Sequence, residues 1–515
     1  MSFCLDEKKK LIFRAFIFCF IFNLFLYQDI YGSDWPMWRY DASHSAESPY
    51  ELPSEMNLQW ERQYTPRIMV WDDPLNQDIM PYDRVFEPVV MGKTMFIGFN
   101  DCDKVAALDT ETGEEKWSFY TDGPVRFAPV AWNGSVFFTS DDGYLYCVNA
   151  FSGNLNWKFR GGPSERKVLG NKRIISSLPA RGGPVFKDGK IYFAASIWPF
   201  MGTFIYALDA ETGEVVWVND GTGAKYMLQP HNSPSFAGVA PQGTLVAVGD
   251  RLLVSGGRSV PACFNRHTGE FLYYELAGSG KTGGSFVCAT EDVFFNHHRE
   301  RVTTMYDIEN GKAVVKSIGK YPVLSKKTYY LSGASITALN SEGIKYNPKK
   351  WEESKIWEIK VNASYDLIKA GNRLYAAGEQ GITAIDLSGN REEPEIAWTK
   401  KVDGQVERLL AADGKLFAVT LDGRIMAFGA RKGTPLKNPY RPVMTKLSEQ
   451  ISQKALSILE QTGVKEGYAL LYGVSSGDLL EALVRNSDLH ITAVDLDPVK
   501  VDKLRRRFDK SGLSG

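Results

Sequence analysis

The chain is built from one repeated unit, Leu108-Asp109-Thr110-Glu111-Thr112-Gly113-Glu114-Glu115-Lys116-Trp117, and degraded copies of it recur along most of the length. In this unit the side-chain oxygens of Asp109 and Thr112 can accept hydrogen bonds from nearby backbone N–H groups. Gly113 supplies the positive φ that a short hairpin loop needs. Trp117 gives the strand that leaves the turn a large apolar anchor. The unit therefore predicts a β-hairpin followed by an anchored strand.

The copies keep a glycine and, in most cases, place an aromatic residue four positions after it. They lie at residues 148–153 with Trp157, 208–214 with Trp217, 264–270 with Tyr273, 306–311 with Val315, and 384–389 with a delayed Trp398. A lone hairpin is only marginally stable in water, so hairpins repeated at intervals of roughly 40 residues predict units that bury faces against each other.

Eight groups of three predicted strands lead into these turns. They cover residues 86–108, 128–148, 183–208, 244–264, 285–306, 321–339, 367–385 and 409–428. Outer strands are expected at Trp60, Trp117, Trp157, Trp217, Tyr273, Val315, Trp357 and Trp398. The last group ends without an outer strand, whereas the strand at 58–64 has no turn before it. We therefore expect this N-terminal strand to complete the last blade and close a ring, which removes open sheet edges.

The repeat at residues 206–217 is similar to those of the pyrroloquinoline-quinone-like (quinoprotein) β-propellers, and the resemblance extends from Trp35 to Ala430. It implies a mainly β chain with an eight-bladed propeller at residues 34–429. The family includes dehydrogenases that bind the quinone and a calcium ion. It also includes cofactor-free scaffolds such as the propeller lipoprotein of the outer-membrane barrel assembly machinery. The resemblance alone does not choose between these functions.

Composition narrows the class of protein. The 515 residues are 44% hydrophobic and 13% aromatic, which excludes a disordered chain. The 60 lysines and arginines nearly balance 61 aspartates and glutamates, so nucleic-acid binding is disfavoured. Residues 1–33 are typical of a signal peptide, with basic residues before a short apolar run, and predict an exported, periplasmic or cell-envelope protein. The alternative is an uncleaved anchor, which would be the only membrane contact.

Four cysteines follow this segment: Cys102, Cys147, Cys263 and Cys288. Scattered cysteines on strand-like stretches are more often small buried hydrophobic residues than disulfide partners. The stretch at 296–300 holds two adjacent histidines, but neighbouring side chains on a strand point apart and no third ligand is evident. We therefore predict no metal site and identify no catalytic residue.

Beyond the propeller the composition changes. Residues 430–443 are rich in proline, glycine and basic residues and indicate an extended linker. From residue 444 to 515 the pattern predicts a helix, a strand, a turn, a helix, a strand and a helix capped by Asp497 with Pro498 next to it. This order predicts a partial α/β, Rossmann-like segment.

The turn after the first of these strands is a candidate cofactor site. Gly473, Ser475 and Gly477 lie between strand and helix, and Asp495 ends the next strand, where it could bind ribose hydroxyls. The segment resembles the start of a class I S-adenosylmethionine-dependent methyltransferase. It departs from that family at Ser475, where a glycine is usual, and at Leu471, where an acidic residue is usual. We therefore expect weak S-adenosylmethionine binding at best and no methylation.

Long insertions indicate where the propeller binds a partner. The links at 64–85, 160–182, 197–202 and 219–236 should share one face of the disc, and only the insertion at 341–354 should lie opposite. Loops carry function more often than the scaffold does, so this long-loop face is the expected surface for a protein or small-molecule partner. Its candidate contacts are Trp198, His231 and Asn232. The alternative is loop decoration without function.

The sequence thus predicts an exported binding or interaction scaffold attached to an incomplete methyltransferase-like segment. A quinone-dependent dehydrogenase is the alternative, although a vicinal cysteine pair, typical of many such enzymes, is missing. An S-adenosylmethionine-dependent methyltransferase fused to a propeller is a further alternative if the chain is a fragment.

Overall fold

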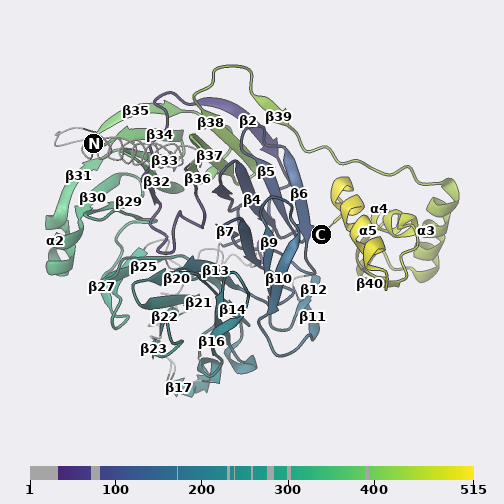
Figure 1. Cartoon of the computed structure of the whole chain (residues 1–515). Helices are drawn as coiled ribbons and strands as arrows, with labels where there is room; N and C mark the ends of the chain where they lie inside the picture. Colours follow the sequence, from purple (N-terminus) through teal and green to yellow (C-terminus); the bar gives the residue numbers. More distant parts are fainter. Residues whose placement is uncertain are drawn as a thin grey trace, which may run out of the picture.

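Eight small antiparallel sheets surround a central axis, and a separate α/β unit lies beside them (Figure 1). The computed structural model describes residues 33–70, 82–170, 172–224, 226–228, 232–236, 238–256, 259–274, 284–297, 303–388 and 394–514. The predicted eight-bladed propeller followed by a small α/β segment is confirmed.

The first four blades each consist of four strands that follow one another in sequence. They are β3 (Val89–Met91), β4 (Thr94–Phe99), β5 (Lys104–Asp109) and β6 (Glu115–Tyr120); β7 (Val130–Trp132), β8 (Ser135–Thr139), β9 (Tyr144–Asn149) and β10 (Leu155–Arg160); β13 (Gly182–Lys187), β14 (Lys190–Ala195), β15 (Phe204–Asp209) and β16 (Val215–Asn219); and β20 (Val246–Val248), β21 (Arg251–Gly256), β22 (Ser259–Asn265) and β23 (Phe271–Tyr273). The short β19 (Gly243–Thr244) pairs in parallel with β13.

The remaining blades continue the pattern. They are β24 (Val287–Ala289), β25 (Val293–His297), β26 (Thr303–Asp307) and β27 (Ala313–Val315); β28 (Val323–Leu324), β29 (Thr328–Leu331), β30 (Ile336–Asn340) and β31 (Lys355–Ile359); β32 (Asp366–Ala370), β33 (Arg373–Gly378), β34 (Gly381–Asp386) and β35 (Glu395–Lys400); and β36 (Val406–Ala412), β37 (Lys415–Thr420), β38 (Arg424–Gly429) and β2 (Asn57–Gln63).

The N-terminal strand closes the ring, as predicted. β2 pairs antiparallel with β38, with Leu58 opposite Phe428 and Trp60 opposite Ala427. On its other edge β2 pairs in parallel with β39 (Leu436–Asn438), so part of the segment expected to be a linker extends the last blade. The ring is therefore closed by segments from both ends of the propeller sequence.

Tryptophans on several outer strands dock one blade on the turn of the next. The indole Nε1 of Trp60 donates to Thr110 O at 2.8 Å, and that of Trp117 donates to Ala150 O at 3.0 Å. A Cβ built on Gly213 would lie 2.7 Å from Trp157, so this turn needs glycine for space as well as for its φ of 75°. These aromatic residues therefore serve packing, as the sequence predicts.

Residues 33–48 lie across the channel on the side of the β3–β4 and β36–β37 turns. Their backbone groups form hydrogen bonds with residues of seven of the eight blades. Examples of these partners are Val90, Ala247 and Lys369. Arg39, Tyr40, His44 and Ala46 all adopt positive φ, a conformation that costs about 1 kcal/mol or more per non-glycine residue. The bonds to the blades offset this cost. β1 (Glu47–Ser48) ends the segment, beside β32.

The C-terminal unit has its own core. It comprises α3 (Glu449–Thr462), β40 (Glu466–Tyr472), α4 (Asp478–Arg485), β41 (Asp488–Val494) and α5 (Pro498–Ser511), and its two strands are parallel. As predicted, Asp497 caps α5 by accepting from Val499 N and Lys500 N. Within the described ranges, no helix has the length and apolarity needed to span a membrane.

Candidate binding face

The central channel of the propeller is filled by its own side chains. The indole Nε1 of Trp38 donates to Glu87 Oε2 at 3.0 Å, and Arg408 Nε lies 2.7 Å from Glu87 Oε1. Phe286 packs edge-on against Trp38 and beside Tyr321, with ring centroids 5.1 and 4.4 Å apart respectively. The cavity that these residues line measures about 20 Å³, which is room for about one water molecule.

The channel also contains charged groups that are paired with each other. Burial raises the pKa of Glu87 to about 7, although Arg408 opposes this shift. Arg39, from the N-terminal segment, reaches Asp366 Oδ1 at 3.1 Å, and Asp366 Oδ2 accepts from Leu409 N at 2.9 Å. These contacts tie the N-terminal segment to the seventh and eighth blades.

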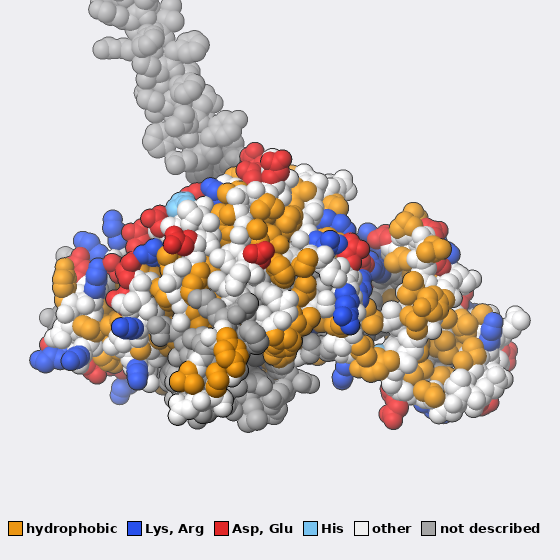
Figure 2. Space-filling view, turned by 90° about the horizontal axis from the view of Figure 1, so that it is seen from below, with side chains coloured by type: hydrophobic (Ala, Val, Ile, Leu, Met, Phe, Trp, Pro, Cys, Tyr) orange, Lys and Arg blue, Asp and Glu red, His pale blue; other side chains and the backbone are white. Residues whose placement is uncertain are grey.

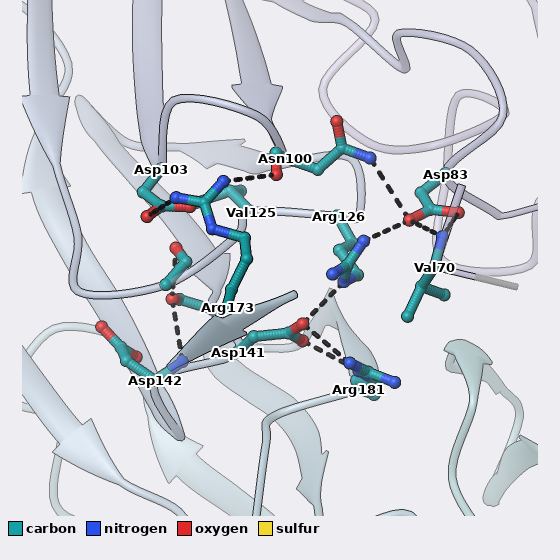
Figure 3. Close-up of polar contacts among 12 residues, drawn as sticks. Val70, Asp83, Asn100, Asp103, Val125, Arg126, Asp141, Asp142, Arg173 and Arg181 are labelled. Carbon is teal, nitrogen blue, oxygen red and sulfur yellow. Dashed lines mark hydrogen bonds and ion pairs between the residues drawn. The ribbon is translucent and has the colours of Figure 1, made fainter. Parts of the chain in front are cut away.

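A buried chain of alternating charges supports the long-loop face (Figure 3). Arg126 lies between Asp83 and Asp141, with N···O distances of 2.5 and 2.7 Å, and Arg181 donates to both oxygens of Asp141 at 2.8 and 2.9 Å. Burial opposes ionisation of Asp141, but the two guanidinium groups outweigh it and lower its pKa to about 2. Asp83 also accepts a hydrogen bond from Val70 N. The row of buried charges therefore holds both ends of the link that follows β2.

A second insertion folds back over the first blade on the same face. The hairpin of β11 (Lys167–Gly170) and β12 (Arg173–Ser176) interrupts the link between the second and third blades. Arg173 forms an ion pair with Asp103 and donates to Asn100 O at 3.3 Å, both in or beside the β4–β5 turn. Burial raises the pKa of Asp103 to about 7 despite this pairing. The predicted links at 64–85 and 160–182 therefore share one face.

Exposed apolar side chains gather on two further insertions of this face. The 3₁₀ helix η1 (Pro199–Met201) packs against η2 (Thr222–Ala224). The two are so close that a Cβ added to Gly223 would lie 2.9 Å from Pro199 O. A two-stranded hairpin, β17 (Tyr226–Leu228) and β18 (Pro234–Phe236), follows η2. We define the aromatic patch as the exposed large residues of these insertions: Trp198, Phe200, Met201, Tyr226 and Leu228.

The exposed fractions in the aromatic patch run from 40% for Met201 to 68% for Phe200. The rings of Trp198 and Phe200 stack with centroids 5.9 Å apart. Figure 2, which views the molecule from the side where β17 lies in Figure 1, shows hydrophobic side chains at the surface of this part of the propeller. Large apolar side chains exposed on insertions of one face are typical of interaction sites.

The sequence-predicted contacts fall unevenly on this face. Trp198 is 46% exposed and precedes η1, inside the aromatic patch. Asn232 is exposed between β17 and β18 with φ of 64°. His231 lies outside the described residues. Sequence analysis missed Tyr226 and Leu228; their alternation on a short strand within the link at 219–236 was the available signal.

The candidate cofactor turn in the C-terminal unit is occupied by internal contacts. Gly473, Ser475 and Gly477 all have positive φ. Asp495 accepts from Val474 N and Asp497 N, each at 3.0 Å, and from Lys500 Nζ at 3.1 Å. These donors lower the pKa of Asp495 to about 2. Asp495 lines a cavity of about 560 Å³, but its oxygens already bind backbone and lysine donors.

The residues of the channel do not fit the cofactor of the quinoprotein dehydrogenases. Sites for small molecules measure about 300–1,000 Å³, whereas the channel cavity measures about 20 Å³. In the part of the chain that the structure describes, no three His, Cys, Asp or Glu side chains come close enough to hold a metal ion. Cys102, Cys147, Cys263 and Cys288 form no disulfide, and the last three of them are buried.

These features define the class: an eight-bladed PQQ-like propeller with a filled channel and one elaborated face. A protein-family model described as "Outer membrane protein assembly factor BamB" matches residues 59–316, which is half of the chain. The chain therefore belongs to this family.

Curated relatives include different kinds of protein. The dehydrogenase subunit of a quinone alcohol dehydrogenase from Gluconobacter oxydans is 31% identical over 142 residues, which cover 25% of this chain and 18% of that protein. Outer membrane protein assembly factor BamB from Burkholderia pseudomallei is 23% identical over 272 residues, covering 52% of this chain and 65% of that protein. The chain thus spans less than two thirds of these relatives.

Among solved structures, the quinohemoprotein alcohol dehydrogenase from Comamonas testosteroni aligns with a TM-score of 0.52 at 12% identity. The alignment covers 83% of this chain and 85% of that structure. At this identity the likeness concerns the fold alone.

Proposed function

We propose that this protein is an exported binding scaffold whose long-loop face holds a protein partner through the aromatic patch. The observation that carries the proposal is the contrast between the two places where a PQQ-like propeller could bind. The channel leaves about 20 Å³, while Phe200 and Tyr226 are 68% and 63% exposed on the face. Aromatic residues are favoured in the cores of protein interfaces.

The buried charge chain supports the same proposal. Arg126, Asp141 and Arg181 fix the base of the face, and charged groups buried in pairs are costly to separate. Loops on a rigid base lose little conformational entropy on binding, which favours affinity. An export signal at residues 1–33 would place the scaffold in the periplasm or cell envelope.

Site-specific photo-crosslinking in the native host tests the proposal. A photoreactive phenylalanine replaces Phe200 in one chain and Tyr346 in another. Tyr346 is 84% exposed and ends α2 (Ser341–Tyr346), which follows β30 and whose Lys345 contacts Asp292 beside the β24–β25 turn on the opposite face. We expect one discrete protein adduct from position 200 and none from position 346. Adducts from position 346 alone, or equal adducts from both, would contradict the proposal.

A further inference from the structure

The C-terminal unit touches the propeller through a small set of charged and polar groups. Asp509 of α5 lies 2.5 Å from Lys104 Nζ, and Tyr120 Oη donates to the same carboxylate oxygen at 2.6 Å. The Lys104 side chain is only 6% exposed, so this ion pair is largely removed from water. We call Lys104, Tyr120 and Asp122 of the first blade the rim socket.

Two arginines of α5 complete the contact. Arg505 forms an ion pair with Asp122. The guanidinium carbon of Arg506 lies 5.1 Å from the centroid of the Tyr120 ring, which is cation–π geometry. One face of α5 thus presents an acidic group and two basic groups to matching charges on the rim.

No apolar core joins the two bodies. The apolar residues of α5, Leu504 and Phe508, pack with Val474 and Leu480 of their own unit. Among the described residues, each hydrophobic cluster belongs wholly to the propeller or wholly to the C-terminal unit. Cavities of about 1,050 and 560 Å³ lie along the junction. Lys and Arg side chains gather there (Figure 2).

The connection between the bodies permits separation. β39 ends at Asn438 and α3 begins at Glu449. Val443 N donates to Lys510 O, and Thr445 hydrogen-bonds to Glu481, Arg485 and Arg507 of the C-terminal unit. The free part is therefore 439–442, which can reach about 15 Å when extended. Relative movement is the expected behaviour of domains that share no large hydrophobic interface.

We propose that the rim socket is a docking site for α5 which the C-terminal unit occupies reversibly, and that ionic strength sets its occupancy. The side chains of the Arg505–Asp122 pair are 37% and 54% exposed, so their attraction weakens as salt shortens the screening length from about 10 Å at 0.1 M to about 3 Å at 1 M. Release uncovers the cavity beside Asp495, which in the docked state is walled by Asp103 and Arg173 of the propeller.

The test is small-angle scattering of the full chain at 0.05 and 1 M NaCl. We expect a compact particle at low salt and a larger radius of gyration at high salt. Asp509→Asn should give the larger radius already at low salt, because a charge-assisted contact with Lys104 is lost. Glu460→Gln is the matched charge-removing control, since Glu460 is exposed on α3, which makes none of the contacts described above.

Circular dichroism of the variants establishes that α5 and the blades stay folded, and Lys104→Met tests the socket from its other side. An unchanged radius in Asp509→Asn, or a wild-type chain that stays compact at 1 M salt, overturns the proposal. A wild-type chain already extended at low salt also overturns it.

Discussion

Gly213 meets two requirements of the repeat at once. Its φ of 75° favours glycine, and its missing side chain leaves room for the Trp157 ring of the preceding blade. Gly153 and Gly269 stand in the same relation to Trp117 and Trp217. The side-chain oxygen of Asp209 accepts from Glu211 N and Thr212 N, as the sequence predicts.

Gly213→Ala should therefore destabilise the propeller by about 2–4 kcal/mol, from backbone strain plus overpacking. Gly189→Ala is the matched control, because Gly189 has the same φ of 75° but nothing within 4 Å of an added Cβ. We expect Gly189→Ala to lower the free energy of unfolding by about 1–2 kcal/mol. Denaturant unfolding measures both, and equal costs would show that the tryptophan contact contributes nothing.

His44 links stability to pH. It is buried, its Nδ1 lies 2.7 Å from Val287 O, and burial lowers its pKa to about 4 from 6.5. A lowered pKa means that the unfolded chain binds more protons between these values. The stabilisation that neutral His44 gives the folded state is therefore complete above pH 6.5. About 3 kcal/mol of it is lost as the pH falls toward 4. His44→Gln should remove this slope in unfolding curves, whereas substitution of exposed His267 should preserve it.

At the scale of elements, the N-terminal segment carries more of the fold than its sequence indicates. Removing residues 33–49 while keeping β2 deletes backbone hydrogen bonds to seven blades, each worth roughly 1 kcal/mol. We expect a chain that begins at residue 50 to melt well below one that begins at residue 33. Calorimetry compares the two, and coincident melting curves would refute a structural role for the segment.

The C-terminal strand–turn–helix should not act as a cofactor site. Asp495 already accepts from two backbone N–H groups and Lys500, so a ribose would have to displace them. Isothermal titration should detect no S-adenosylmethionine or S-adenosylhomocysteine binding in the micromolar range. Micromolar affinity that disappears in Asp495→Ala would disprove this expectation.

Local and periodic features were predictable from sequence, whereas contacts between distant residues were not. The turn at Asp109, the ring closure through Trp60 and the capping by Asp497 each follow from a few neighbouring residues or from counting strands. By contrast, Arg39 meets Asp366 across 327 positions, and nothing near either residue marks the other as its partner. The same limit hid the charge chain through Arg126 and most of the aromatic patch.

At the scale of the whole molecule, the propeller is closed at its centre and elaborated on one face. Trp38, Glu87 and Arg408 fill the central channel, and the cavity that they line is far smaller than a small-molecule site. Membership of the family is thus compatible with a binding role that uses the long-loop face and leaves the channel closed.

The most direct test of this account is to incubate the purified chain with pyrroloquinoline quinone and Ca²⁺, and then to measure thermal stability and dye-linked oxidation of alcohols and sugars. Ligand at a hundredfold excess over its Kd would stabilise the fold by about 2.7 kcal/mol and raise the Tm. We predict an unchanged Tm and no dye reduction. A raised Tm together with turnover would contradict the closed channel and the scaffold role built on it.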